Sequence, residues 1–254
     1  MTTHVWNHWV GPIALVAALG AGLATAPARA ATLYDAAAGS LPSAQGWAPL
    51  ALGAAAAQSV GSGSYRLDTT GTGVVIWGNG LLSPVPLDTA TGFDLSFSLQ
   101  MVNETHTSVN RTGYSVVMVG ADASKALELA FWNDHVWVYD YDPTHADRFV
   151  HGADASFDTT AAMTSYTLAV RNQQFTLTAN GNSLLSGALR DYTAEGLPYT
   201  TPNFLFFGDD TSRGTSISLL GNVSVTAVPE LATVALMLGG LAALAGLRQR
   251  AARR

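Results

Sequence analysis

Apolar and polar residues alternate along several short stretches of this chain, which is the pattern of β-strands. Residues 93–101 show it most clearly, because every second position is apolar: Phe93, Leu95, Phe97, Leu99 and Met101. Nine residues of period two predict a half-buried antiparallel strand. The alternation recurs at residues 166–170 and 175–179, and the apolar run 114–119 predicts a strand buried on both faces.

Turn residues separate these stretches. Asn180-Gly181 predicts a two-residue hairpin, because both residues tolerate positive φ. Residues 133–135 predict another short turn, between strands at 127–132 and 136–139. Further strands are expected at 65–69, 74–77, 204–207 and 217–225, and a loose loop over the Ala-, Gly- and Ser-rich residues 36–63. We therefore expect an all-β fold over residues 31–227, either a sandwich or a barrel.

Composition narrows the class of protein. The 254 residues are 48% apolar and 12% charged, which excludes a disordered chain. The absence of Cys excludes a disulfide scaffold, a thiolate zinc site and a Cys nucleophile. Five of the 12 basic residues and one of the 18 acidic residues lie outside 31–227, so this stretch carries a net charge of −10. Such a charge disfavours nucleic acid and anionic lipid as partners.

The N-terminal residues have the organisation of a secretory signal. An apolar run spans residues 10–26, and Ala28 and Ala30 are small residues at the two positions that a signal peptidase reads. We interpret residues 1–30 as a signal peptide cleaved after Ala30. Residues 1–9 contain no Lys or Arg, which is atypical, and an uncleaved N-terminal membrane helix is the alternative.

The C-terminal residues predict a membrane span. Residues 231–247 carry no charge over 17 positions, roughly 25 Å of helix, the short limit for crossing a bilayer. A soluble core helix is disfavoured because the stretch has no polar face. Basic residues beyond a span stay on the cytoplasmic side, so the body would lie outside the cytoplasm. The basic cluster consists of Arg248, Arg250, Arg253 and Arg254.

Residues 228–254 combine a Val-Pro-Glu motif, an apolar helix and a terminal arginine cluster, in this order. This arrangement resembles the PEP-CTERM sorting signal of Gram-negative bacteria. The resemblance implies recognition of Pro229 and Glu230 by an exosortase, a membrane-embedded enzyme that would remove the tail near the motif. The protein would then be released or attached at the cell surface. The third motif position is usually Pro in that family and is Leu231 here.

The order of strands resembles a concanavalin-A-like jelly roll of the laminin-G type. Five short segments also resemble bacterial choice-of-anchor domains: 131–132, 189–192, 198–202, 203–210 and 221–225. These resemblances imply a two-sheet sandwich with a surface location, and no settled activity.

Catalytic motifs are scarce. Glycosidases on concanavalin-like folds need two carboxylates across a cleft, usually in a Glu-x-Asp-x-x-Glu strand, and residues 128–133 supply only the first acid. We expect Glu128 to be a solvent-facing strand residue, with Glu104 and Glu195 distant from it in sequence. The histidines form no zinc-binding helical pair and are expected in polar loops: His106, His135, His145 and His151. Nucleophile elbows, phosphate loops and dinucleotide fingerprints are absent.

Two groups of residues are candidates for binding. Asp140, Asp142 and Asp147 lie within eight residues that also hold His145, and such a loop suits Ca²⁺ as a cofactor, with an acidic turn as the alternative. Asp209-Asp210 is a weaker candidate. Alternation places the side chains of Trp137, Tyr139 and Tyr141 on one face, either as core or as a platform for sugar rings.

The sequence favours an exported, surface-sorted, noncatalytic β-sandwich of the envelope or extracellular matrix, with polysaccharide as a candidate ligand. Signal peptidase and an exosortase-like enzyme are the expected processing partners. A polysaccharide-degrading enzyme on the same fold and a purely structural or adhesive surface protein are the alternatives.

Overall fold

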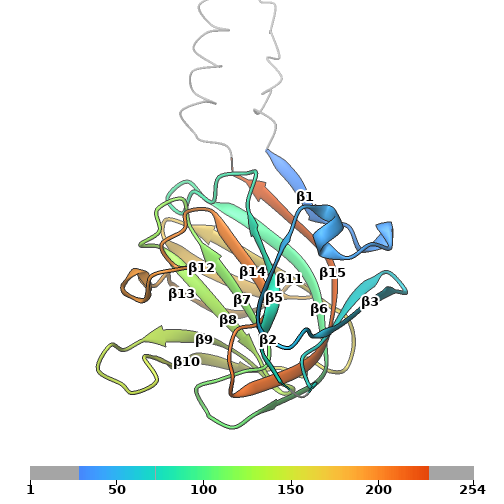
Figure 1. Cartoon of the computed structure of the whole chain (residues 1–254). Helices are drawn as coiled ribbons and strands as arrows, with labels where there is room; N and C mark the ends of the chain where they lie inside the picture. The colour runs from blue at the N-terminus through green and yellow to red at the C-terminus, as the bar shows by residue number, and fades with distance from the viewer. Residues whose placement is uncertain (1–28, 72, 229–254) are drawn as a thin grey trace, which may run out of the picture. The chain divides into compact units, whose positions relative to one another are not determined.

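The computed structural model describes residues 29–71 and 73–228, which form two facing antiparallel β-sheets (Figure 1). The all-β two-sheet sandwich predicted from sequence is therefore confirmed. Sheet A contains, in spatial order, β13 (Asn182–Ala188), β12 (Gln174–Ala179), β11 (Thr164–Arg171), β6 (Phe93–His106), β15 (Gly214–Ala227), β4 (Ser64–Asp68) and β3 (Ala57–Gly61), and β1 (Ala30–Tyr34) also pairs with β15.

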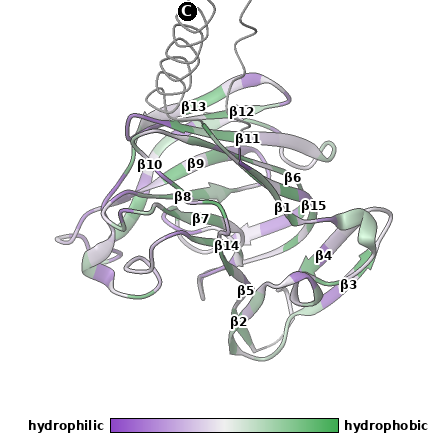
Figure 2. Cartoon of the chain, turned by 90° about the horizontal axis from the view of Figure 1, so that it is seen from above, coloured by the Kyte–Doolittle hydropathy of each residue, from purple (hydrophilic) through white to green (hydrophobic). Residues whose placement is uncertain are grey.

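Sheet B contains, in spatial order, β10 (Phe149–Ser156), β9 (His135–Tyr141), β8 (Ala126–Phe131), β7 (Ser115–Val119), β14 (Phe204–Asp209), β5 (Val74–Leu82) and β2 (Ala48–Gly53). Three short 3₁₀ turns connect strands, at Ala36–Ala38, Pro42–Gln45 and Thr193–Glu195. In Figure 2 strands β7 and β8 are largely green, which marks apolar residues.

The main core lies between the sheets and is rich in aromatic rings. Phe97 of sheet A stacks on Tyr166 with ring centroids 5.3 Å apart, and it meets Phe131 and Phe207 of sheet B edge-on at 6.2 and 5.4 Å. Edge-to-face pairs of this kind add to the free energy gained by burying apolar area. Phe97 thus connects the two sheets at the centre of the sandwich.

Several local predictions agree with the structure. The five alternating apolar residues of 93–101 are all buried in β6, and the polar residues between them are half-buried. β12 and β13 pair through the Asn180-Gly181 turn, where both residues have positive φ. All five residues of β7 are buried, as expected for a strand covered on both faces.

The prediction of a loose loop over residues 36–63 was wrong. This stretch contains two 3₁₀ turns and the edge strands β2 and β3. All six residues of β2 are exposed, so it has no buried face to impose an alternating pattern. β10 was also missed, since a register shift between His151 and Asp154 interrupts its pairing with β9.

Most residues of the predicted export signals lie outside the described residues: Ala28, Pro229, Glu230, Arg248, Arg250, Arg253 and Arg254. Ala30 is exposed and is the first residue of β1. Within 29–71 and 73–228, no helix is long and apolar enough to cross a membrane. Residues 10–26 and 231–247, where membrane segments are expected, are not among those described.

Candidate functional site

The outer face of sheet B, turned away from the main core, carries the candidate site. A segment of residues 190–203, which we call the crossing segment, runs over this face between β13 and β14. Tyr192 of this segment is fully buried, and its hydroxyl donates to the carbonyl oxygen of Tyr139 at 2.6 Å. Val117, Phe204 and Phe206 form an apolar cluster with Tyr192 on the same face. The crossing segment therefore turns part of an outer sheet face into a second, smaller core.

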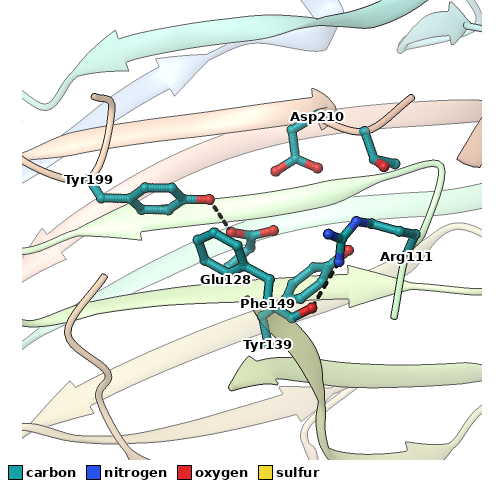
Figure 3. A pocket seen from close by; sticks show the side chains of 7 residues that line it. Arg111, Glu128, Tyr139, Phe149, Tyr199 and Asp210 are labelled. Carbon is teal, nitrogen blue, oxygen red and sulfur yellow. Dashed lines mark hydrogen bonds between the residues drawn. The ribbon is translucent and has the colours of Figure 1, made fainter. Parts of the chain in front are cut away.

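Two carboxyl groups lie in the same pocket beneath this cover (Figure 3). Glu128 of β8 is 3% exposed, and its neighbour Asp210 follows β14 and is half-buried. Tyr199 of the crossing segment donates its hydroxyl to Glu128 Oε2 at 2.5 Å. Ser115 Oγ donates to Asp210 Oδ1 at 2.9 Å. Each acid thus has a hydroxyl partner of its own.

Burial dominates the electrostatics of the pair. Loss of solvent raises the pKa of Glu128 well above its usual range, and the neighbouring charge of Asp210 raises it further. Burial also raises the pKa of Asp210, while the neighbouring Glu128 and the hydrogen bond from Ser115 act in the opposite direction. Two neighbouring carboxyl groups away from water cannot both be charged cheaply, so ionisation of the second group is disfavoured.

Arg111 lies beside the pair but its hydrogen bonds are directed elsewhere. Its guanidinium donates to the carbonyl oxygens of Asn110, Asp147 and Phe149 at 2.5, 3.0 and 2.9 Å. Its positive charge lowers the pKa of Glu128 and of Asp210. Arg111 therefore stabilises negative charge in the pocket while it holds the neighbouring loop in place.

The cavity between these groups has a volume of about 120 Å³. Its lining consists of Arg111, Glu128, Tyr139, Phe149, Tyr199, Asp210 and Thr211. That volume accommodates roughly four water molecules. Glycosidic cleavage needs carboxylates about 5–10 Å apart so that the sugar bond lies between them. The groups that line this pocket can also accept and donate hydrogen bonds to ligand hydroxyls.

The structure brings only some of the residues singled out from the sequence into this site. The expectation that Glu128 faces solvent was wrong, because the crossing segment covers it. Asp210, weighed only as a weak metal candidate, is its partner. Arg111, Ser115 and Tyr199 had no signal in the sequence.

The sugar-platform interpretation needs correction for two of its three residues. Trp137, Tyr139 and Tyr141 do share the outer face, but Trp137 and Tyr139 are 0% and 2% exposed. Trp137 stacks against His151 with ring centroids 4.3 Å apart, and Tyr139 lies under Phe149. Tyr141 is half-buried and donates its hydroxyl to Glu195 at 2.7 Å. These residues form a covered aromatic cluster and not an open platform.

The predicted calcium loop is not formed as a metal site. Arg190 holds Asp140 at 2.8 Å, and Asp142 accepts hydrogen bonds from the backbone and hydroxyl of Thr144. Asp147 accepts hydrogen bonds from Asn110 at 3.0 Å and from Arg213 at 2.5 Å. In the described part of the chain, no group of three or more His, Cys, Asp or Glu side chains is arranged to hold a metal ion. The three carboxylates instead anchor the β9–β10 hairpin.

A second polar pocket of about 410 Å³ surrounds Trp132 at the end of β8. His106 stacks on Trp132 at 4.2 Å, and its Nδ1 lies 3.1 Å from the buried carboxylate of Glu104. The rings of His135 and His151 also contact Trp132. Three histidines expected in separate polar loops are thus gathered around one indole.

No protein-family model matches this sequence, and no curated protein does. The structure is similar to that of a carbohydrate esterase from the Shiga toxin-encoding bacteriophage phi24B, with 15% identity, a TM-score of 0.55, and coverage of 78% of this chain and 99% of that one. A protein of unknown function with a galectin-like fold from Bacillus subtilis matches with 12% identity and a TM-score of 0.49, over 80% of this chain and 100% of that one. Alginate lyase A1-II', of polysaccharide lyase family 7, matches with 14% identity and a TM-score of 0.43, over 68% of this chain and 84% of that one. At 15% identity, the likeness to the bacteriophage protein shows the β-sandwich fold alone.

Proposed function

We propose that this protein is exported, sorted through residues 228–254, and then binds carbohydrate at the bacterial surface or in the extracellular matrix without breaking it. Its sandwich would be a concanavalin-A-like jelly roll of the choice-of-anchor kind. The observation that carries the binding half is the polar pocket of Glu128, Asp210 and Tyr199 within an otherwise apolar cluster. Apolar side chains at these positions would avoid the cost of burying acids, so stability alone does not account for them.

Carbohydrate is the ligand class favoured by the chemistry of the pocket. Hydroxyl groups both donate and accept hydrogen bonds, which suits a pocket lined by two carboxyl groups and a phenol hydroxyl. The similar bacteriophage structure is that of a protein described as a carbohydrate esterase, which is a further reason to test carbohydrates first. Residues 128–133 lack the second and third acids of the pattern that is usual in glycosidases on this fold, which favours binding over cleavage.

The binding half is tested with the purified protein on an array of neutral and acidic polysaccharides that includes the host's own exopolysaccharide, with Ca²⁺ and with chelator. Binding that is unchanged by chelator is expected, since the acidic hairpin forms no metal site. Asp210→Asn keeps the shape of the side chain but removes its acid, and should weaken binding about tenfold or more. Asp122→Asn, an exposed acid that binds its own loop, is the matched control.

Three results would refute this half of the proposal. If Asp210→Asn and Asp122→Asn lose binding equally, then binding does not depend on the acid of the pocket. Release of new reducing ends or unsaturated products from any bound polysaccharide would favour the enzyme alternative. No binding to any polysaccharide would favour a structural or adhesive surface protein.

The sorting half is tested by deleting residues 228–254 and comparing cell fractions and medium. The resemblance to the sorting signal predicts that the truncated protein no longer reaches the fraction in which the full chain is found. A second variant with Gln at Arg248, Arg250, Arg253 and Arg254 keeps the apolar stretch and removes only the charge. Unchanged localisation of the truncated protein would contradict this half alone.

A further inference from the structure

An apolar cavity of about 250 Å³ adjoins the carboxyl pair on the outer face of sheet B. Asp210 and Tyr199 line both this cavity and the polar pocket, so the two lie on either side of these residues. The rest of its lining is apolar and comes from β2, β5, β7, β14 and the crossing segment: Leu50, Ile76, Val117, Phe206 and Pro198. A ligand here meets hydrogen-bonding groups at one end only.

The charges around this cavity select against an anionic ligand. Its lining in the described chain includes one carboxyl, Asp210, and no basic residue. Arg111 faces the polar pocket, where its guanidinium is already bound to three carbonyl oxygens. The sandwich as a whole carries the excess of acids noted above. A uronate or a phosphorylated sugar would therefore be repelled.

The apolar lining sets a second requirement. A hydroxyl placed against Ile76, Val117 and Phe206 would lose its hydrogen bonds to water and find no partner. A methyl group at the same place would instead be stabilised by burial. The volume is below the roughly 300–1,000 Å³ of sites for drug-sized ligands, which suits a single sugar residue.

We propose that this cavity holds a 6-deoxyhexose residue of a neutral polysaccharide, with its methyl group against the apolar lining and its ring hydroxyls toward Asp210 and Tyr199. This proposal rests on the proposed carbohydrate-binding function and names its ligand class. Leu50 lines both this cavity and a neighbouring hollow of about 540 Å³ that reaches Leu82 and Phe204. The hollow gives room for the next residue of a polymer.

The test compares pairs of sugars that differ only in the 6-hydroxyl: methyl fucoside with methyl L-galactoside, and methyl L-rhamnoside with methyl L-mannoside. Affinities for the purified protein are measured by calorimetry or by saturation-transfer NMR. In at least one pair, the deoxy sugar should bind about tenfold more tightly. Equal affinities within both pairs would overturn the proposal, as would tighter binding of glucuronate.

Two variants test whether the preference for deoxy sugars arises at this cavity. Leu50→Ser introduces a hydroxyl at a side chain that is 39% exposed, so the fold should tolerate it, and should reduce the deoxy preference at least severalfold. Leu52→Ser changes the same residue type on the same strand at a side chain that is 58% exposed and lines neither cavity, and should leave the preference unchanged. An unchanged preference in Leu50→Ser would overturn the proposal. Polysaccharide binding without any preference for deoxy sugars refutes this inference alone, whereas absence of all carbohydrate binding refutes the proposed function as well.

Discussion

Asp209 should make this protein lose stability as pH rises through the neutral range. It is the last residue of β14, is 1% exposed, and its Oδ1 accepts the backbone N–H of Thr211 at 3.1 Å. Burial, partly offset by that hydrogen bond, raises the pKa of Asp209 to about 8 from an ordinary value of 3.8. The folded state therefore binds a proton that the unfolded chain releases near pH 4.

The sign and size of the effect follow from proton linkage. The folded protein binds more protons than the unfolded chain between pH 4 and 8, so the free energy of unfolding falls as pH rises. The contribution is fully present below about pH 4 and is lost as pH passes through about 8. At roughly 1.4 kcal/mol per pH unit, a shift of about four units corresponds to about 6 kcal/mol.

Replacing Asp209 with Asn tests this reasoning. The amide oxygen can still accept from Thr211, but the side chain no longer titrates. We expect Asp209→Asn to have a free energy of unfolding within about 1 kcal/mol of the unmodified protein at pH 4, and to be more stable by several kcal/mol at pH 9. Urea unfolding followed by tryptophan fluorescence at each pH from 4 to 9 gives both curves. The Glu128–Asp210 pair is present in both proteins, so most of its own pH dependence cancels in the difference.

Asp158→Asn serves as the control for Asp209. Hydrogen bonds from the hydroxyl and backbone of Thr160 hold the pKa of Asp158 below its usual range, so it stays charged throughout this window. Its substitution should shift the stability by the same amount at every pH. If the difference between Asp209→Asn and the unmodified protein is also independent of pH, then Asp209 is not buried as a protonated acid and the reasoning fails.

Three further substitutions, the last with a matched control, probe the pocket, the core and the sheet. Tyr199→Phe leaves Glu128 without its hydroxyl donor and should lower the free energy of unfolding by about 1–3 kcal/mol in urea titrations at pH 6; no loss would mean that water replaces the donor. Phe97→Ala opens a cavity at the centre of the main core and should cost about 3–5 kcal/mol, measured by calorimetry. Gly208→Ala would place a Cβ 2.4 Å from the Cα of Gly78 on the neighbouring strand β5, at φ 153°, and should prevent recovery of folded protein. Its control, Gly181→Ala, meets no atom within 4 Å but has φ 80°, so it should cost only about 1–2 kcal/mol. Equal yields of the two alanine variants would show that β14 and β5 can separate without loss of the fold.

The strands that were predicted correctly are those in which burial leaves a pattern in the strand's own residues. In β6, one face lies on the core and the other is half-exposed, so every second residue is apolar. The Asn180-Gly181 turn needs positive φ at two adjacent positions, which its residue types reveal directly. By contrast, β2 is a fully exposed edge strand, and its residues are free of any alternating constraint. Its place beside β5 depends on backbone pairing with residues far along the chain.

The candidate site was harder to predict because its environment comes from distant segments. Alternation along β8 places the side chain of Glu128 on the face of the strand opposite to those of Leu127 and Leu129. Glu128 therefore lies on the outer face of sheet B. An outer face is ordinarily solvated, so Glu128 was expected to face solvent. What buries it is the crossing segment, where Tyr199 lies 71 residues later in the chain. No local pattern encodes that contact.

One local sign of the site was nevertheless present. Glu128 is the single charged residue in Ala-Leu-Glu-Leu-Ala-Phe, and a strand solvated on its outer face would carry polar residues at the other outer positions too. Those positions are Ala126 and Ala130, which are small and apolar, so the outer face of β8 is itself patterned for burial. A lone acid on such a face must have partners, since an unpaired buried charge is unstable. The search for those partners leads to Asp210 and Tyr199, and their position beside the apolar cavity makes this face of the sandwich the place to look for a ligand.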